Sequence, residues 1–298
     1  GGNHALLLST AGDVYAWGRN TSGQLGLADQ VSRTTPTKVT LPAAAVSIAA
    51  GREFSVAALA DGRVFAWGLN GDGQLGDGTR FSSLSPVEVT GITGVTEVAA
   101  GNAHVLALRN DGSVWAWGSN LSGQLGNGGF VLSRTPVATL ATGIARIRAG
   151  GDSSLAITAR RTGLAWGENS GGQLGLGSQT SNDLPWPAGV LANVVDGAAA
   201  DTLSTFVGSD GLLRSTGNNE TGSLGDGTTT ARTTYGTVNV VASALAVSVG
   251  GRSFAVALRA DGKLLSWGDN TAKQLGNTTL TSTGTSTPTE VPGFSAGP

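Results

Sequence analysis

One twelve-residue segment recurs six times along this chain of 298 residues, and no other feature constrains the fold as strongly. The copies read YAWGRNTSGQLG, FAWGLNGDGQLG, WAWGSNLSGQLG, LAWGENSGGQLG, RSTGNNETGSLG and LSWGDNTAKQLG. The glycine after the tryptophan position falls at residues 18, 68, 118, 167, 217 and 268, so successive copies lie 50, 50, 49, 50 and 51 residues apart. A fixed period of this length is typical of repeat architectures. We therefore predict one domain over residues 1–298, with repeats near 1–50, 51–100, 101–150, 151–199, 200–250 and 251–298.

Each repeat reads as short strands joined by tight turns. In the second repeat, the apolar run Phe54–Ala60 is followed by Asp61-Gly62 and then by the run Arg63–Gly68. An Asp-Gly pair between two β-rich runs is typical of a two-residue hairpin turn. Further along, Pro86–Thr90 fits an outer edge strand, where a proline costs no ladder hydrogen bond, and Val95–Ala100 fits the strand that begins the next unit.

Both faces of the predicted hairpin are apolar. A two-residue turn would place Val56 opposite Trp67 and Ala58 opposite Phe65. One face would then carry Val56, Ala58, Phe65 and Trp67, and the other Ala57, Leu59, Val64 and Ala66. A sheet with one wet face alternates apolar and polar residues, whereas the blades of a propeller are buried on both faces. The sequence therefore predicts an all-β fold, a β-propeller of four-stranded antiparallel blades, with a solenoid as the alternative.

Two places depart from the repeat. The fourth repeat has Arg160-Arg161-Thr162 where the others carry the turn pair, and it is one residue short, so we expect its hairpin to differ. Because Gly1–His4 aligns with Gly101–His104, the counterpart of Val95–Ala100 is absent from the first repeat, and we expect its blade to lack a strand. Six repeats predict six blades, and a seven-bladed ring only if a blade lies outside the chain.

Composition argues against several classes of function. Lys and Arg number 18 against 20 Asp and Glu, and no basic block occurs, so we expect no nucleic-acid partner. No apolar run is long enough to span a membrane, so we expect no membrane insertion. The chain has no Cys and no Met, and a chain without oxidisable sulfur suits a secreted or cell-surface location, which we expect in a bacterium.

The third repeat resembles a known family. Gly101-x-x-His104, then Asp111-Gly112, then the run WGSNLSGQLG that ends at Gly126 are similar to the repeat of the regulator of chromosome condensation family, and the resemblance covers essentially the whole chain. It implies a β-propeller of four-stranded blades, usually seven. Relatives include a secreted β-lactamase inhibitor, a nucleotide-exchange factor for a small GTPase and a plant photoreceptor, so the resemblance implies a protein partner.

The recurring side chains suit packing better than chemistry. Five repeats carry Trp at one position and the fifth repeat carries Thr216; we interpret these indoles as buried between blades and not as a chromophore, because the photoreceptor's Gly-Trp-Arg-His-Thr motif is missing. The recurring Asn residues are typical turn caps, and the glycines of GQLG are interpreted as bends that need no Cβ. His4 and His104 share one repeat position and are expected to pack in the core or at the rim.

No motif for catalysis or cofactor binding is apparent. Neither histidine has a nucleophile placed for a triad, and no phosphate-binding loop occurs. The stretch Asn70–Gly78 resembles a calcium loop but lacks the terminal Glu. We therefore predict that the protein is not an enzyme and has neither a metal nor a cofactor; a hydrolase or lyase with its site in the channel is the alternative without motif support.

Two sets of residues are predicted to bind a protein partner. The polar segments after each QLG carry aromatic and arginine residues of the kind that anchor interfaces; they are Arg80, Phe81, Phe130, Trp186, Arg232 and Tyr235. A second set, just after the glycine that enters each blade, is expected to ring one rim of the axis; it is Asn3, Arg52, Asn102, Asp152, Asp201 and Arg252. The sequence thus favours a non-catalytic interaction propeller. A structural module of a larger extracellular assembly and a nucleotide-exchange factor for a small GTPase are the alternatives.

Overall fold

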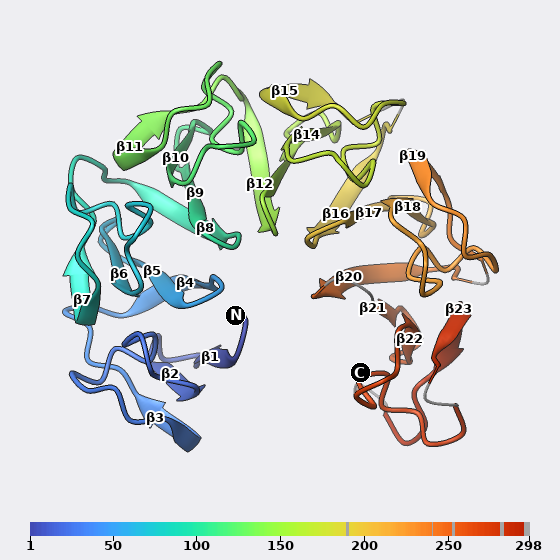
Figure 1. Cartoon of the computed structure of the whole chain (residues 1–298), viewed down its shortest axis with the longest axis horizontal. Helices are drawn as coiled ribbons and strands as arrows, with labels where there is room; N and C mark the ends of the chain where they lie inside the picture. Colours follow the sequence, from blue (N-terminus) through green and yellow to red (C-terminus); the bar gives the residue numbers. More distant parts are fainter. Residues whose placement is uncertain (189–190, 240, 252–253, 281–282, 295–298) are drawn as a thin grey trace.

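The chain forms six antiparallel sheets arranged around a central axis (Figure 1). The structure is a computed structural model that describes residues 1–188, 191–239, 241–251, 254–280 and 283–294. These residues contain 23 strands and no helix, and accordingly none that could cross a membrane. The all-β propeller predicted from the repeat is confirmed, and the solenoid alternative is wrong.

We call the six sheets blades 1 to 6 in chain order. Blades 1 to 3 contain β1 (His4–Leu8), β2 (Val14–Gly18), β3 (Arg33–Lys38); β4 (Ala45–Ala50), β5 (Phe54–Leu59), β6 (Val64–Gly68), β7 (Ser83–Glu88); and β8 (Val95–Ala100), β9 (His104–Arg109), β10 (Val114–Gly118), β11 (Ser133–Ala138). Blades 4 to 6 contain β12 (Ile144–Gly150), β13 (Ser153–Thr158), β14 (Gly163–Gly167), β15 (Asn182–Pro187); β16 (Val194–Ala199), β17 (Leu203–Gly208), β18 (Leu213–Gly217), β19 (Arg232–Thr237); and β20 (Ala244–Gly250), β21 (Phe254–Arg259), β22 (Leu264–Gly268), β23 (Thr285–Glu290).

Each sheet keeps its strands in sequence order, with the first strand nearest the axis (Figure 1). Blades 2 to 6 have four strands and blade 1 has three among the described residues. The strand that blade 1 lacks is the inner one, because β1 pairs with β2 as β5 pairs with β6 in blade 2. The expectation of an incomplete first blade is confirmed.

The register of the central hairpin differs from the predicted one by one residue. The predicted pairs Ala58–Phe65 and Val56–Trp67 are wrong: the observed pairs are Ala58–Val64 and Val56–Ala66. The faces therefore regroup, with Val56, Ala58, Val64 and Ala66 on one side and Ala57, Leu59, Phe65 and Trp67 on the other. The same one-residue shift occurs in blade 3, where Leu108 pairs with Val114.

A longer turn explains the shift. The amide of Leu59 donates to the Arg63 carbonyl at 2.8 Å, and the amide of Gly62 donates to the Leu59 carbonyl at 2.9 Å. These bonds enclose a three-residue loop in which Gly62, at φ 84°, is the residue with positive φ. A type I turn followed by a left-handed glycine has this form, and in it Asp61 keeps a negative φ.

The fourth hairpin keeps the geometry of the others. The amide of Arg161 donates to the Thr158 carbonyl at 2.8 Å, and the amide of Thr158 donates to the Thr162 carbonyl at 3.0 Å. Arg161 takes the glycine's place with φ 62°. The prediction of a different hairpin is therefore wrong. Ser153 pairs with Gly167 as His104 pairs with Gly118, so the missing residue lies before β13.

Both faces of the inner blades are buried, as predicted. The Val56 face of blade 2 packs on Val105, Ala107 and Trp117 of blade 3. The Trp67 face packs on Val14, Ala16 and Leu25 of blade 1. The hydrophobic core is thus a series of layers between blades, with each hairpin contributing to two of them.

Each buried tryptophan joins two blades. Trp67, Trp117, Trp166 and Trp267 are each 0 % exposed. Their indole nitrogens donate to main-chain carbonyls of the preceding blade, at Gln24, Gln74, Gln124 and Ser223, over 2.9 to 3.0 Å. The last glycine of each GQLG lies against the ring; a Cβ on Gly76 would come within 2.7 Å of Trp117 Nε1. Packing between blades is confirmed for these four indoles, and the glycine gives room to the ring as well as bending the chain.

Blades 1 and 6 border an opening in the ring (Figure 1). Leu7 of blade 1 is 45 % exposed, and Trp17 is only half-buried. On blade 6, the one described residue that a Cβ on Gly276 would meet is Val291, at 3.4 Å, whereas the equivalent glycines of blades 1 to 5 each lie against an aromatic ring of the next blade. Within the described part of the chain, these two faces lack the neighbour that every other face has.

Candidate interaction face

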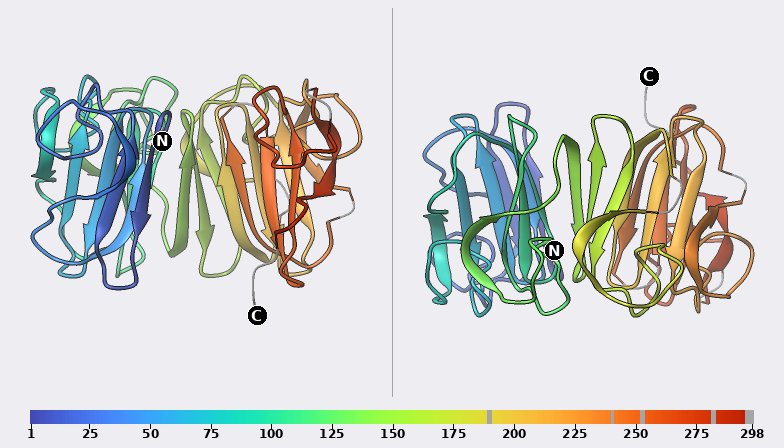
Figure 2. Two further views of the ribbon diagram at one scale, coloured as in Figure 1. Left: turned by 90° about the horizontal axis from the view of Figure 1, so that it is seen from below. Right: turned by 90° about the horizontal axis from the view of Figure 1, so that it is seen from above.

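The loops that follow the first and third strands of a blade emerge at the same end of the propeller. Antiparallel strands reverse direction at each step, so these loops share one end and the hairpins between second and third strands lie at the other, as the side views show (Figure 2). We call the first end the loop face. It carries the inner-strand loops and the long segments that include residues 19–32, 69–82 and 119–132.

Main-chain hydrogen bonds tie the inner rim of the loop face together. The amide of Gly2 donates to the Arg52 carbonyl at 3.1 Å, that of Arg52 to Asn102 at 3.3 Å, and that of Asn102 to Gly151 at 2.7 Å. The predicted rim residues Arg52, Asn102 and Asp201 share this ring position. The prediction from spacing alone chose Asn3 in blade 1 and Asp152 in blade 4, and each lies one residue after the ring position.

The two residues that lie one position after the ring, Asn3 and Asp152, accept a different hydrogen bond. The carbonyl of Asn3 accepts from the Arg19 amide at 2.8 Å, and that of Asp152 from the Glu168 amide at 2.9 Å. They therefore lie beside the ring position and not in it. Arg252, the remaining member of the predicted set, lies outside the described residues.

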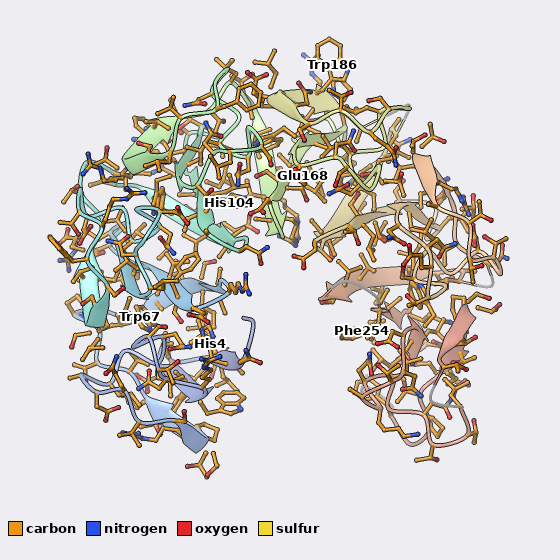
Figure 3. The ribbon with its side chains drawn as sticks, in the orientation of Figure 1. His4, Trp67, His104, Glu168, Trp186 and Phe254 are labelled. Carbon is orange, nitrogen blue, oxygen red and sulfur yellow. The ribbon has the colours of Figure 1, made fainter. Side chains whose placement is uncertain are left out.

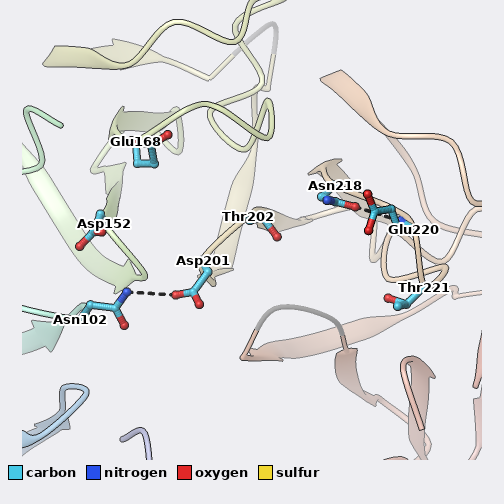
Figure 4. A pocket seen from close by; sticks show the side chains of 8 residues that line it. All are labelled: Asn102, Asp152, Glu168, Asp201, Thr202, Asn218, Glu220 and Thr221. Carbon is cyan, nitrogen blue, oxygen red and sulfur yellow. Dashed lines mark hydrogen bonds between the residues drawn. The ribbon is translucent and has the colours of Figure 1, made fainter. Parts of the chain in front are cut away.

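A pocket of about 390 Å³ opens on the inner rim between blades 3, 4 and 5 (Figure 4). Its lining residues are polar or acidic; they are Asn102, Asp152, Glu168, Asp201, Thr202, Asn218, Glu220 and Thr221. The side-chain nitrogen of Asn102, Nδ2, donates to Asp201 Oδ1 at 3.2 Å. No lysine or arginine is among these lining residues, so four carboxylates share the space without a base on its wall.

The pKa values of two of these carboxyl groups shift in opposite directions. Burial, and then the charges of Asp201, Glu168 and Asp72, raise the pKa of Asp152 above its usual range. Burial also acts to raise the pKa of Glu168, but hydrogen bonds from Ser122 and Ser170 outweigh it and lower the pKa. Glu168 therefore stays ionised and gives the pocket a negative field.

Buried asparagines hold the long loops in place. The Asn70 side chain is 0 % exposed; its oxygen accepts from the Leu75 amide at 2.9 Å, and its nitrogen donates to the Phe81 carbonyl at 3.1 Å. Asn20 and Asn120 make the same pair of contacts in blades 1 and 3. The predicted capping role of these residues is confirmed.

Beyond these asparagines, the loop tips of blades 1 to 3 are apolar and exposed. Val31, Phe81 and Val131 hold one equivalent position and are 61 %, 83 % and 80 % exposed. The predicted anchors Arg80 and Phe130 sit beside them; Arg80 is exposed and Phe130 is 51 % exposed. The structure thus brings three of the predicted anchors, Arg80, Phe81 and Phe130, to the same face.

Trp186 and Arg232 lie in outer strands and not in loops. Trp186, in β15, is 57 % exposed at the periphery (Figure 3). Arg232 begins β19 and pairs with Asp226, whose carboxylate accepts from Arg232 Nε at 2.9 Å. Burial opposes ionisation of Asp226, but the hydrogen bonds from Arg232 and Thr228 outweigh it and lower the pKa to about 2. Arg232 is therefore engaged within its own blade.

Tyr235 is a packing residue. Blade 5 has Thr216 where the others have Trp, and the Tyr235 ring from β19 fills the space; a Cβ on Gly175 would clash with Tyr235 Cε2. Its ring centroid is 5.3 Å from that of Phe206, and its hydroxyl is 2.6 Å from Ser204 Oγ. The pairing of Thr216 with an aromatic residue in the same repeat was the signal in the sequence for this compensation.

Several residues of the loop face were missed from the sequence. Leu121 is 79 % exposed, and it precedes Ser122, whose hydroxyl donates to Glu168 at 2.7 Å. Val131, Glu168 and Glu220 also belong to the face. Comparing one repeat position across blades would have found two of them, since Leu121 and Glu220 stand where the other blades carry Gly, Ser or Thr.

The histidines take part in inter-blade contacts. His4 and His104 are buried in different blades (Figure 3). Their Nε2 atoms lie 2.9 Å from Ser55 Oγ and 3.0 Å from Ser154 Oγ in the following blade. The expectation of a packing position is confirmed.

The fold and the loop face define a propeller of repeated four-stranded blades with variable loops at one end. A family model described as "RCC1-like domain" matches residues 1–297. The chain therefore belongs to the RCC1-like domain family.

Solved structures share this fold over nearly the whole chain. The crystal structure of Kap60 bound to yeast RCC1 (Prp20) matches with a TM-score of 0.85 and 25 % identity, covering 98 % of this chain and 73 % of that one. Human WBSCR16 matches with a TM-score of 0.82 and 25 % identity, covering 94 % of this chain and 78 % of that one.

Curated relatives match over shorter segments. A "Regulator of chromosome condensation" of Drosophila melanogaster is 40 % identical over 65 residues, which is 21 % of this chain and 12 % of that protein. The human "Probable E3 ubiquitin-protein ligase HERC3" is 49 % identical over 41 residues, 14 % of this chain and 4 % of that protein. The matched segments thus span a small part of these relatives.

Proposed function

We propose that this protein is a non-catalytic interaction propeller that binds a protein partner through its loop face. The exposed apolar tips carry the proposal: Phe81 and Val131, at 83 % and 80 %, are the two most exposed large hydrophobic side chains among the described residues. Exposed apolar groups gathered on one face mark interaction surfaces. Yeast RCC1 (Prp20), whose structure resembles this one, has been crystallised with a protein partner, Kap60.

The tips are held rigidly, which favours binding. Asn70 fixes the Phe81 carbonyl, and Asn120 fixes the Val131 carbonyl, through buried hydrogen bonds. A side chain presented on an ordered turn loses less conformational entropy when a partner covers it. Aromatic side chains and arginine are also the residue types that most often dominate binding energy. Arg80 and Phe81 supply both on one turn.

Site-specific photocrosslinking tests this proposal. A photoreactive phenylalanine analogue replaces Phe81 in the full chain, and the matched control places it at Ala159, exposed on the hairpin end of blade 4. We expect crosslinks to one partner protein, in lysate or medium of the source organism, from position 81 and none from 159. Equal yields from both positions, or none from 81, would overturn the assignment of the loop face.

Nucleotide exchange on a small GTPase is the second candidate, and the structural likeness to yeast RCC1 (Prp20) is the observation that favours it. Release of a fluorescent guanine nucleotide from a purified GTPase measures it directly. Under the interaction proposal, the release rate stays unchanged when the protein is added. Acceleration that Phe81→Ser abolishes would instead establish exchange through the same face.

We further propose a secreted or cell-surface location, with the propeller as a module of a larger extracellular assembly as the alternative. Its support is compositional, since the chain contains neither Cys nor Met and therefore no sulfur for oxidants to modify. Fractionation of the source cells, with detection by antibody, tests the location; recovery in the cytosolic fraction alone would contradict it.

A further inference from the structure

The loop tips of blades 2 and 3 carry exposed apolar side chains with an arginine near each. We call this set the tip patch and define it as Arg80, Phe81, Phe130, Val131 and Arg134. The three apolar members are 83 %, 51 % and 80 % exposed, and both arginines are exposed. Phe81 and Val131 hold equivalent positions in the two blades, so they face the same side of the propeller.

Arg134 joins the two loops. Its carbonyl accepts from the Gly78 amide at 3.0 Å, and a Cβ on Gly73 would lie 2.8 Å from its Cα. It therefore rests against the blade 2 loop that presents Phe81. In its own blade it follows Val131 by three residues. Arg134 thus lies at the boundary between the two blades.

The arginines of the tip patch are free to meet a ligand. Among the described residues, no ion pair involves Arg80 or Arg134. The blade 2 loop, residues 69–82, also carries two carboxylates, Asp72 and Asp77, and Asp77 accepts from the Thr79 amide and hydroxyl at 2.9 Å. The blade 3 loop, residues 119–132, contains no charged residue. The patch therefore combines apolar area with two arginines that pair with no carboxylate among the described residues.

The neighbouring sector of the face has the opposite character. In blade 4, Gln179 and Thr180 replace the apolar tips, and Asp183 takes the place of Arg134 against the preceding loop. The inner pocket of blades 3 to 5 adds four carboxylates. An acidic ligand would be drawn to blades 2 and 3 and repelled from blades 4 and 5, which fixes its orientation on the face.

We propose that the tip patch docks a protein segment in which apolar side chains are flanked by Asp or Glu. This inference rests on the proposed function and names the chemistry of the partner. Apolar side chains of the segment cover Phe81 and Val131, and its carboxylates meet the Arg80 and Arg134 guanidinium groups, which suit paired contacts to carboxylate oxygens. The positive charge of Arg80 and Arg134 favours a segment with acidic residues over one with basic residues.

Selection from a random peptide library displayed on phage tests the inference with the full chain as bait. We expect the selected peptides to be enriched in Asp and Glu beside Phe, Leu or Trp. Phe81→Ser, and Arg80→Glu combined with Arg134→Glu, should each weaken binding by about tenfold or more, as expected when a central anchor or a close charge pair is lost. Arg160→Glu makes the same change of charge at the hairpin end and should leave the affinity unchanged.

A charge swap makes the test reciprocal. Peptides whose acidic residues are replaced by Lys should bind the Arg80→Glu, Arg134→Glu variant better than they bind the parent. Three results would overturn the inference: no selected peptide that Phe81→Ser weakens, no acidic enrichment over the library, or equal binding to the parent and the double arginine variant.

The two proposals fail in different ways. A crosslink from position 81 to a partner whose contacting segment is basic would leave the proposed function standing and overturn the acidic specificity. Peptides that bind with no loss from any loop-face variant, together with a silent photocrosslinker at position 81, would overturn both.

Discussion

At the scale of single residues, blade packing depends on complementary pairs across each boundary. The last glycine of GQLG leaves the space that the next tryptophan occupies, as Gly76 does for Trp117. Where the tryptophan is lost, at Thr216, Tyr235 restores the volume from another strand. The requirement is therefore for a filled space beside the glycine and not for an indole as such.

The glycine has two roles that substitution can separate. Gly76 and Gly276 have similar φ values, 68° and 62°, but only Gly76 faces a neighbouring ring. Gly276→Ala should cost about 1 kcal/mol, from the left-handed backbone alone. Gly76→Ala adds the clash with Trp117 and should cost about 3 kcal/mol. Urea unfolding of the two variants compares them, and equal losses would contradict the role in packing.

A second kind of pair joins blades through histidine. His104 Nε2 lies 3.0 Å from Ser154 Oγ, which in turn donates to the Gln124 carbonyl at 2.8 Å. Because the serine proton is used in that bond, His104 Nε2 must be the donor. The Nδ1 atom is buried without a hydrogen-bond partner, and burial lowers the pKa, so the ring is neutral near pH 7. In blade 2 the corresponding pair is apolar, with Phe54 packed near Val105.

These histidines should make stability depend on pH. Burial lowers the pKa of His4 and His104 to about 4, whereas the unfolded chain takes up these protons near its ordinary value of about 6.5. Between the two values the unfolded state binds more protons, so stability is full above pH ~6.5 and falls as the pH drops, by up to about 1.4 kcal/mol per unit for each histidine. Urea unfolding from pH 7 to 4.5 measures the slope.

The apolar pair of blade 2 provides a control variant for the dependence of stability on pH. His104→Phe with Ser154→Val copies the apolar pair of blade 2 and removes one of the two titrating rings. We expect the variant to lose about half of the histidine contribution to the slope, while carboxyl groups contribute equally to parent and variant. An unchanged slope would show that His104 is not kept neutral by the fold.

At the scale of elements, the sequence predicted the hairpins but not their register. Asp-Gly suits either a two-residue or a three-residue turn, and the difference depends on one hydrogen bond, from the Leu59 amide to the Arg63 carbonyl at 2.8 Å. A change of one residue turns every side chain to the other face. Alternation could not reveal this change, because both faces of the hairpin are apolar.

The fourth hairpin shows how strongly the fold imposes its turn. Arg161 is held at φ 62° although an arginine favours negative φ. Arg161→Gly should therefore stabilise the protein by about 1 kcal/mol, since a left-handed residue with a Cβ is strained by about that amount. Arg160→Gly, one residue earlier at an ordinary φ, should be neutral or destabilising. Thermal unfolding distinguishes them, and no gain from Arg161→Gly would show that the turn is unstrained.

The candidate site was predicted less completely than the fold. Exposed loop residues such as Arg80 and Phe81 follow from a repeat position that varies between copies. Tyr235 was misplaced because its packing partner, the space beside Gly175, comes from another blade. Asn3 and Asp152 were predicted at the ring position although they lie one residue after it. Spacing alone shows neither that the missing residue of the fourth repeat lies before β13 nor which residue of blade 1 aligns with the ring. Contacts between blades therefore decide what sequence periodicity leaves open.

At the scale of the whole molecule, stability is a series of interfaces between neighbouring blades. In such arrays each unit contacts only its neighbours, and the total is close to a sum of unit and interface terms. Blades 2 to 5 each have two complete interfaces, whereas blades 1 and 6 have one and face the opening (Figure 1). The half-buried Trp17 and the open space at Gly276 are the two sides of that opening.

The ends of the arc should therefore open first. In native-state hydrogen exchange of this 298-residue chain, we expect the amides of β1–β3 and β20–β23 to exchange before those of β8–β14. The same contrast should appear in matched variants. Trp117→Ala empties a complete interface and should cost about 3 to 5 kcal/mol, while Trp17→Ala removes a half-buried ring and should cost about half as much or less. Uniform exchange along the chain, or equal costs for the two variants, would mean that the faces at the opening are covered in solution and that the ring is closed.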